Sequence, residues 1–236
     1  MMQDLLQFMQ KLDWSPLFIS LKTGFVATVI CFFLGTWLAG TVYKARPSVK
    51  AVLDGILTLP MVLPPTVAGF FLLLFFSLRR PFGKYLFQVH GIKIVQTWLG
   101  CIIAATIIAL PLMYRNARAA FELVDENLVY AARTLGMSET EIFFKVLLPT
   151  ARPGILSGVI LTFARALGEY GATSMLAGNI PGKTGTISQR IAMVIQDGNY
   201  RVAGFWTAVI ILIAFVIIVV MNLITGQRQR GRGDVR

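Results

Sequence analysis

The chain has 236 residues, of which 56% are hydrophobic and only 14% are charged, and its formal net charge is +11. Soluble domains carry about a quarter charged residues, so this composition, with a mean hydropathy of +0.71, excludes an ordinary soluble domain. The basic residues lie mostly in loops and tails beside long apolar runs, and no nucleic-acid-binding motif accompanies them. We therefore expect membrane lipid as a partner and no nucleic acid.

Four stretches of the chain lack charged residues and His over lengths that fit a membrane. A helix needs about 20 apolar residues to cross roughly 30 Å of hydrocarbon. The sequence therefore predicts an all-α integral membrane protein, with a transmembrane domain over 17–226 and a short N-terminal extracytoplasmic segment, 1–16. These four spans are expected at 17–43, 53–78, 94–116 and 202–226.

The second of these spans contains Pro60, Pro64 and Pro65. Proline removes backbone hydrogen bonds, which leaves carbonyl groups that protein or water must satisfy. One interpretation is a bent helix that lines a translocation route, with Thr58 or Thr66 offering hydroxyl groups, and the other is a static kink. We favour the first, because broken spans are typical of cavities.

The segment between the third span and the next, about 115–152, carries its own helix signals. FELVDENLVYAARTLG predicts a helix that Gly136 stops, and Ser138 with Glu141 forms a capping box for a second helix. We expect this second helix to end at Pro149. The apolar residues of the segment indicate either a docking surface or an amphipathic hairpin that lies on lipid.

A fifth span is predicted after Pro153, in GILSGVILTFARALGEYGATSMLAGN. Arg165 and Glu169 are four residues apart, so they share a helix face and can pair, either as a local ion pair near the interface or as part of a gate. Gly154 and Gly158 predict a close contact with another helix. The chain is thus expected to be a polytopic bundle of about five transmembrane helices.

The stretch AGNIPGKT, residues 177–184, imitates a phosphate-binding P-loop but has Ala177 in place of the first glycine. A P-loop needs a strand before it and a helix after it within a sheet domain, and Pro181 removes one of the amides that would bind phosphate. We therefore interpret the stretch as the start of an outer loop, about 179–201. Asn179 is one of its turn-forming residues, and Lys183 could attract an oxyanion or an acidic partner.

The orientation follows from the basic residues. Five crossings put the termini on opposite sides, and the basic tail QRQRGRGDVR, 227–236, belongs on the cytoplasmic side. The 115–152 segment then also lies inside. Cys31 and Cys101 each lie within a span and lack metal-ligand spacing, so they are expected to be small packing residues.

One stretch of the inner segment, YAARTLGMSETEIFFKVLLP, resembles the EAA loop of ABC-importer permeases. Two alanines, a glycine and the final Leu-Pro match, whereas Tyr130 occupies the glutamate position of that pattern. In this family the loop forms a coupling helix that docks into a separate ATPase subunit. The residues expected to act in coupling are Tyr130, Ala131, Ala132, Arg133, Gly136, Ser138, Glu141, Phe143, Leu148 and Pro149.

Three further stretches narrow the resemblance: LPMVLPPTVAG, FARALGEYGAT and AGNIPGKTGT. Together they resemble permeases of molybdate importers, and sulfate or thiosulfate permeases are nearer kin than sugar or amino-acid permeases. The likeness runs from about residue 15 to 225. Sulfate, thiosulfate or tungstate remain the alternative cargoes.

The resemblance implies a type I ABC-importer permease fold in the bacterial inner membrane. Two copies of the chain would form the pore, two ATPase subunits would bind ATP and Mg, and an extracytoplasmic oxyanion-binding protein would deliver the cargo. The chain itself would bind no cofactor and catalyse no reaction. The residues expected in the pathway or gate are Pro60, Pro64, Pro65, Thr66, Arg165 and Glu169, with Asn179 and Lys183 in the outer loop.

Two other classes of protein are weighed against a permease. A membrane-embedded enzyme would need a catalytic constellation at membrane depth, such as paired His and Asp or HExxH, and the sequence contains none. A secondary carrier would be expected to show inverted repeats and several intramembrane carboxylates, whereas we find no repeat and only Glu169.

Overall fold

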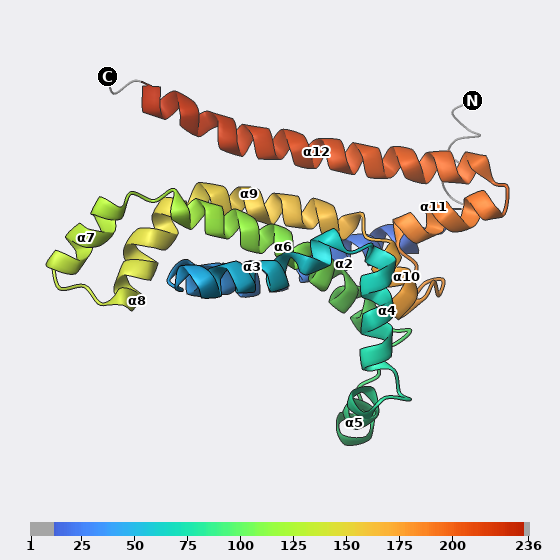
Figure 1. Ribbon diagram of the computed structural model, residues 1–236. Helices are drawn as coiled ribbons and strands as arrows, with labels where there is room; N and C mark the ends of the chain where they lie inside the picture. Colours follow the sequence, from blue (N-terminus) through green and yellow to red (C-terminus); the bar gives the residue numbers. More distant parts are fainter. Residues whose placement is uncertain (1–11, 234–236) are drawn as a thin grey trace.

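The structure, a computed structural model, describes residues 12–233, and between these residues it contains helices and turns but no strand (Figure 1). The predicted all-α class is confirmed. The elements in chain order are α2 (Ser15–Tyr43), α3 (Pro47–Val62), α4 (Pro65–Phe76), α5 (Pro81–His90), α6 (Trp98–Glu122), α7 (Glu126–Thr134), α8 (Glu139–Ile142), the π-helical turn η1 (Phe143–Leu147), α9 (Leu148–Leu167), α10 (Gly171–Ala177), α11 (Ile187–Gln196) and α12 (Tyr200–Gly233).

Both predicted terminal segments fall partly outside the described residues. Of the expected extracytoplasmic segment 1–16, residues 1–11 lie outside, and of the expected basic tail 227–236, residues 234–236 do. The backbone of α12 continues to Gly233, beyond the end at residue 226 that the hydropathy predicts.

The number of spans agrees with the prediction. Within the described residues, four helical segments are long and apolar enough to cross a membrane, and the α3–α4 pair makes a fifth if it counts as one broken span. Three of the four contain α2, α6 and α12, and the remaining one runs from Glu139 through η1 to the end of α9. Three of these helices, α2, α6 and α9, lie side by side in Figure 1.

The bend predicted for the span over 53–78 is confirmed, because the chain breaks there into two helices bent by 106°. Leu63 and Pro64, which join them, both have extended backbone angles, with ψ of 142° and 132°. Each of them precedes a proline, whose ring disfavours the helical conformation of the residue before it. Pro60, in contrast, is accommodated inside α3.

The predicted bounds of the fifth span are wrong at both ends. It begins well before Pro153, because α8, η1 and α9 follow one another without a break, and it ends at Leu167. Pro149 does not stop the helix. It stands in the first turn of α9, where a missing N–H is tolerated, and the Leu148 N–H before it reaches back five residues to the Phe143 carbonyl in a π-type bond.

Small side chains form the core between α2, α6 and α9. The predicted close contact of Gly154 and Gly158 is confirmed, since a Cβ on Gly154 would lie 2.6 Å from the Ala120 Cβ and one on Gly158 would lie 2.8 Å from the Asn116 Cβ. Both neighbours belong to α6. Small residues at such contacts let helix backbones approach closely, which is the main source of helix association in lipid. The buried small residues of this core include Ala27, Cys31, Ala105, Ala109, Ala117 and Ala151.

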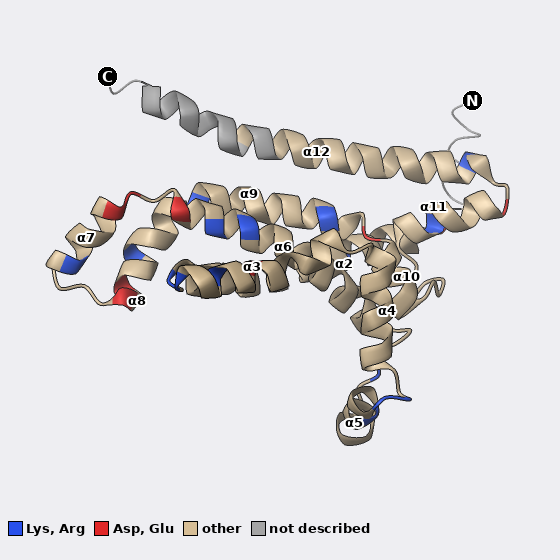
Figure 2. Cartoon of the chain, in the orientation of Figure 1, with Lys and Arg blue, Asp and Glu red and all other residues tan. Residues whose placement is uncertain are grey.

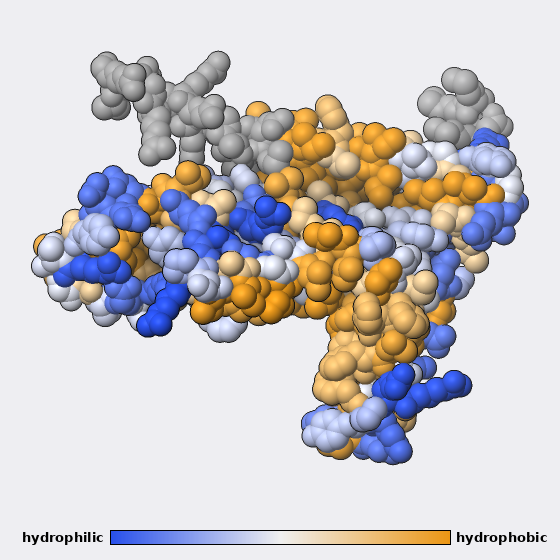
Figure 3. Space-filling model, in the orientation of Figure 1, coloured by the Kyte–Doolittle hydropathy of each residue, from blue (hydrophilic) through white to orange (hydrophobic). Residues whose placement is uncertain are grey.

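Apolar and polar residues occupy different parts of the surface. Apolar residues cover the middle of the bundle and α4, whereas polar residues gather around α7 and α8 at one end and around α5 (Figure 3). Acidic and basic residues both lie near α7 and α8, and further basic residues lie along the bundle, on α11 and beside α5 (Figure 2). The end of the bundle that carries α7 and α8 is called the hairpin end below.

The last helix, α12, packs on the bundle mainly near its start. Ala203 and Trp206 are buried there, and the Trp206 ring lies 5.8 Å from that of Trp14. Farther along, α12 exposes large apolar side chains, among them Ile211, Leu212, Phe215 and Val219. These side chains require lipid or another protein chain around them.

Candidate docking hairpin and translocation pathway

The hairpin of α7, α8 and η1, residues 126–147, is built from local signals. Asp125 caps α7 by accepting the Asn127 N–H at 2.9 Å. Gly136 follows the helix with φ of +77°, a left-handed conformation that costs little only for glycine, and no atom of residues 12–233 lies within 4 Å of a Cβ placed on it. The predicted stop at Gly136 is confirmed, and the backbone conformation alone explains the residue.

The capping box at the start of α8 is also confirmed. The Ser138 hydroxyl accepts the Glu141 N–H at 3.3 Å, and the Glu141 carboxylate accepts the Ser138 N–H at 3.1 Å. A small apolar core then holds the two helices together, formed by Val129, Ala132, Ile142, Met137 and Val146. The hairpin therefore has a defined shape before any partner binds it.

An ion-pair network ties the hairpin to the rest of the bundle. Glu139 accepts a hydrogen bond from the Arg133 guanidinium at 2.8 Å, and its other oxygen lies 3.3 Å from the Lys44 Nζ at the end of α2. This bond to Glu139 raises the pKa of Arg133. Because these side chains are about half exposed, the network orients the hairpin more than it stabilises it.

The predicted coupling residues divide into two groups. Ala132 is buried in the apolar core of the hairpin, and Phe143 and Leu148 pack against the main bundle, so these three hold the hairpin in place. The exposed group consists of Tyr130, Ala131, Arg133, Gly136, Ser138 and Pro149, while Glu141 is partly exposed. Sequence reasoning missed two neighbours of this group, Leu123 and Leu135, whose exposures are 86% and 81%.

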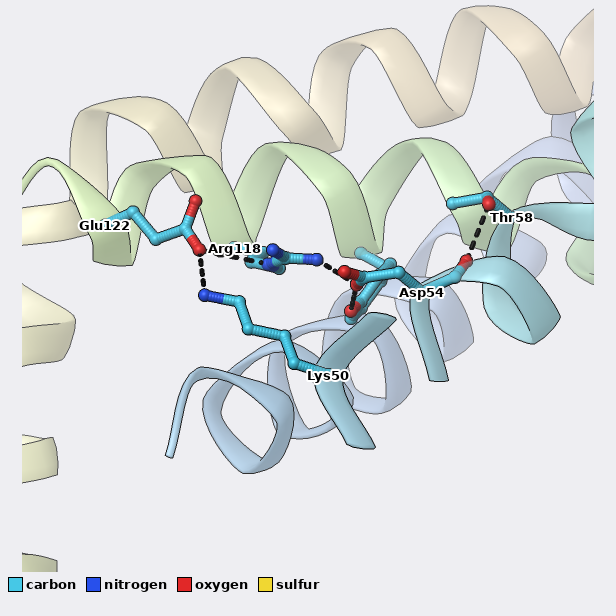
Figure 4. Close-up of polar contacts among 6 residues, drawn as sticks. Lys50, Asp54, Thr58, Arg118 and Glu122 are labelled. Atoms are coloured by element: carbon cyan, nitrogen blue, oxygen red, sulfur yellow. Dashed lines mark hydrogen bonds and ion pairs between the residues drawn. The ribbon is translucent and has the colours of Figure 1, made fainter. Parts of the chain in front are cut away.

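At the same end of the bundle, α3 and α6 are joined by a polar ladder (Figure 4). One face of α3 carries three polar residues at a spacing of four, and α6 does the same, so the two rows meet along the helices. The residues of the ladder are Lys50, Asp54 and Thr58 on α3, and Tyr114, Arg118 and Glu122 on α6.

Every charge within this ladder has an opposite partner. Asp54 accepts a hydrogen bond from the Tyr114 hydroxyl and forms an ion pair with Arg118. Glu122 pairs with Lys50 and, at 3.2 Å, with the Arg118 Nε. Sequence reasoning missed the ladder, although the spacing of four within each helix was a readable signal.

We expect the Asp54–Arg118 pair to contribute measurably to the stability of the chain. In a double-mutant cycle with Asp54→Asn and Arg118→Gln, the coupling energy should be about 1 kcal/mol, because both side chains are largely removed from solvent. The Glu141–Lys145 pair, which is far more exposed, is the matched control and should show no coupling. Thermal unfolding in detergent measures both cycles, and equal coupling in the two would contradict the assignment.

The Arg165–Glu169 pair is present, but not within one helix. The Arg165 Nη1 donates to Glu169 at 2.8 Å, and the predicted pairing is confirmed. Glu169, however, lies beyond the end of α9, is buried, and accepts the Ala172 N–H at 2.8 Å through its other oxygen. It thereby connects the last turn of α9 to the first turn of α10.

The proline break lies directly against this region. A Cβ on Gly171 would lie 3.0 Å from the Pro65 Cβ and 3.1 Å from the Thr66 amide nitrogen, and one on Gly69 would lie 2.6 Å from the Ala172 Cα. The structure thus brings together two predicted pathway motifs that lie about a hundred residues apart. Thr66 is exposed beside the break, whereas the Thr58 hydroxyl is engaged with the Asp54 carbonyl at 2.6 Å.

The P-loop-like stretch closes on itself. The amides of Lys183, Thr184 and Gly185 all donate to the Ile180 carbonyl, at 3.1, 2.9 and 3.2 Å. The buried Thr184 hydroxyl accepts the Ile180 N–H at 2.9 Å. These three amides are therefore not free to bind phosphate, as the sequence interpretation expects. The Lys183 side chain is exposed.

The segment predicted as an outer loop, 179–201, contains a helix, α11, in its middle. Asn179 lies in the turn before α11, and its side chain amide contacts the Met193 sulfur of this helix at 3.6 Å. Thr186 and Gln189 form a capping box at the start of α11, with both reciprocal bonds present. The spacing T-x-x-Q was the signal that sequence reasoning missed.

The family described as binding-protein-dependent transport system inner membrane component matches residues 31–231. The molybdenum transport system permease protein ModB of Escherichia coli (strain K12) is 40% identical over 184 residues, which is 78% of this chain and 80% of that protein. The sulfate transport system permease protein CysT of Salmonella typhimurium (strain LT2) is 33% identical over 214 residues, or 91% of this chain and 76% of that protein.

Among solved structures, an inward-facing conformation of the MetNI methionine ABC transporter matches with a TM-score of 0.69. The two chains are 19% identical, and the match covers 90% of this chain and 94% of the other. This likeness shows the fold alone. It confirms the predicted fold class of an ABC-importer permease.

Proposed function

The chain belongs to the binding-protein-dependent transport system inner membrane components, and we propose that it is the membrane-spanning subunit of an ATP-driven importer for molybdate. The observation that carries the cargo assignment is the 40% identity to a molybdenum permease over most of both chains, against 33% to a sulfate permease. Sulfate, thiosulfate or tungstate import is the alternative.

In this proposal two copies of the chain enclose the pathway. Each copy contributes the proline break between α3 and α4 and the Arg165–Glu169 pair beside it, with Pro60, Pro64, Pro65 and Thr66 along the route. The large apolar side chains that α3, α4 and α12 expose support the presence of further protein or lipid around a single copy. An extracytoplasmic oxyanion-binding protein delivers the cargo, and Asn179 and Lys183 lie on the side of the bundle that faces it.

Two ATPase subunits dock on the hairpins at the cytoplasmic side, where the C-terminus also lies. ATP and Mg act within those subunits, and this chain supplies no catalytic residue. Support for this arrangement comes from the exposed Tyr130, Leu135 and Arg133 on a hairpin that is rigidly attached to α9 and tied to α2. Closure of the ATPases moves the hairpins, and tilting of the attached spans changes which side of the membrane the pathway faces.

The cargo is tested by competition in proteoliposomes that contain this chain, its ATPase and its binding protein. We expect uptake of labelled molybdate that depends on ATP and on the binding protein. Unlabelled tungstate should inhibit it more strongly than unlabelled sulfate does, because tungstate is closest to molybdate in size and charge. If sulfate inhibits as strongly as tungstate, the sulfate alternative replaces the molybdate assignment.

A further inference from the structure

A pocket of about 440 Å³ opens between α3 and α6 at the hairpin end of the bundle. Its walls include four residues of the polar ladder, so it lies beside that ladder and not beside the proline break. The lining residues are Asp54, Gly55, Thr58, Arg115, Arg118, Ala119 and Glu122.

The charges in this pocket leave one cation without a counterpart. Asp54 and Glu122 are matched by Arg118 and Lys50 through the ladder, so these four charges cancel. Arg115 is exposed and forms no ion pair with any side chain that the structure describes. The residues that line the pocket thus carry two negative and two positive charges, and Arg115 is the cation among them that no carboxylate of the described residues pairs.

The pocket also has free space on its α3 side. No atom lies within 4 Å of a Cβ placed on Gly55, and α3 buries none of its residues against the rest of the chain. A glycine inside a helix is less stable than an alanine, and among the described residues no packing contact explains this one. The Thr58 hydroxyl donates to the Asp54 carbonyl and Arg118 pairs with both carboxylates, so Arg115 is the lining residue with an unpaired charge among the described residues.

We propose that this pocket is an exit site for the transported dianion, with Arg115 as the residue that contacts a tetrahedral oxyanion before its release. Guanidinium groups suit such ligands because their planar fork of N–H groups matches two oxygens at once. The inference rests on the proposed function and adds to it the place at which the cargo leaves.

The two carboxylates in the wall fit this role. They leave the lining of the pocket without a net charge, so Arg115 attracts a dianion but the site holds its ligand weakly. A transport pathway needs binding that is strong enough for entry and weak enough for departure. The ladder keeps these carboxylates in place, since each is held by two partners from the opposite helix or from its own.

The site can be tested with an introduced thiol on the full chain in detergent. The native Cys31 and Cys101 are fully buried, so Gly55→Cys provides the reactive thiol. A negatively charged methanethiosulfonate should react faster than a positively charged one, and Arg115→Gln should lower this ratio about fivefold, as expected for loss of one nearby charge. Millimolar molybdate should slow the anionic reagent, and this protection should vanish with Arg115→Gln.

Two further variants keep the test decisive. Arg152→Gln removes an exposed cation of α9 that is not in the pocket. This variant should leave the ratio of the two reagent rates and the protection by molybdate unchanged. If Gly55→Cys does not fold, Thr58→Cys places the thiol in the same pocket. The exit-site proposal is overturned if Arg115→Gln leaves the ratio of the two reagent rates unchanged, or if molybdate still protects the thiol in that variant.

The transport arm separates this inference from the proposed function. In proteoliposomes of the whole transporter, Arg115→Gln should lower molybdate uptake about fivefold while ATPase stimulation by the loaded binding protein persists. Arg115→Lys should recover part of the uptake because the charge is kept. If the wild-type transporter moves no molybdate, the proposed function fails; if it does and Arg115→Gln transports equally well, only the exit site fails.

Discussion

Replacing Arg165 with Met should destabilise the chain by about 3 kcal/mol, more than replacing Glu169 with Gln. The two partners are unequally buried: the Glu169 side chain is 2% exposed and that of Arg165 is 36% exposed. Removal of Arg165 leaves a carboxylate buried without its cation, whereas removal of the Glu169 charge leaves a guanidinium that water can reach. Glutamine at 169 also keeps an oxygen that can accept the Ala172 N–H.

Thermal unfolding of the purified chain in detergent measures the difference. The double variant Arg165→Met with Glu169→Gln should recover most of the loss, because neither charge is then left unpaired. Equal destabilisation by the two single variants, or a double variant as unstable as Arg165→Met alone, would show that burial of the carboxylate does not govern this site.

Replacing Leu135 with Asp should abolish assembly with the ATPase subunit without unfolding the chain. Leu135 is 81% exposed at the tip of the hairpin, so a charge there costs the isolated chain almost nothing. In a docked hairpin the same charge would be buried in the partner, and loss of such a central apolar contact costs about 2 kcal/mol or more, which is on the order of thirtyfold in affinity.

Co-elution of the chain with its ATPase on size exclusion in detergent measures the effect. Val89→Asp is the matched control, since Val89 is also an exposed apolar residue, 58% accessible, but lies on α5 away from the hairpin. We expect normal assembly for that variant. An intact complex with Leu135→Asp would mean that the ATPase binds another surface.

The local parts of the structure could be predicted from the sequence. The stop at Gly136 and the box of Ser138 and Glu141 depend on residues within one turn of each other, and both are present. The apolar runs predict α2, α6 and α12 for the same reason, because length and hydropathy are local quantities. The cargo assignment, in contrast, depends on resemblance and not on any physical property of the residues.

The parts that escaped prediction depend on contacts between distant segments. The prolines predict a bend but not its size of 106°. At this angle α4 packs against α10, a distant segment, where Gly69 contacts Ala172. The spacing of four marks a polar face on α3 and another on α6, but the pairing of the two faces requires the relative position of the helices, which no local pattern supplies. Pro149 misled the prediction because η1 lets the helix pass it.

The π-helical turn has a geometric consequence for how force reaches the spans. A π turn takes one residue more than an α-helical turn and accommodates it without ending the helix. Ile142, just before the π turn, packs in the apolar core of the hairpin, while Leu147, the last residue of the turn, belongs to the main bundle. The segment from 139 to 167 is thus one continuous helical rod that is anchored in two separate apolar cores, so a displacement of the hairpin is passed directly to the span.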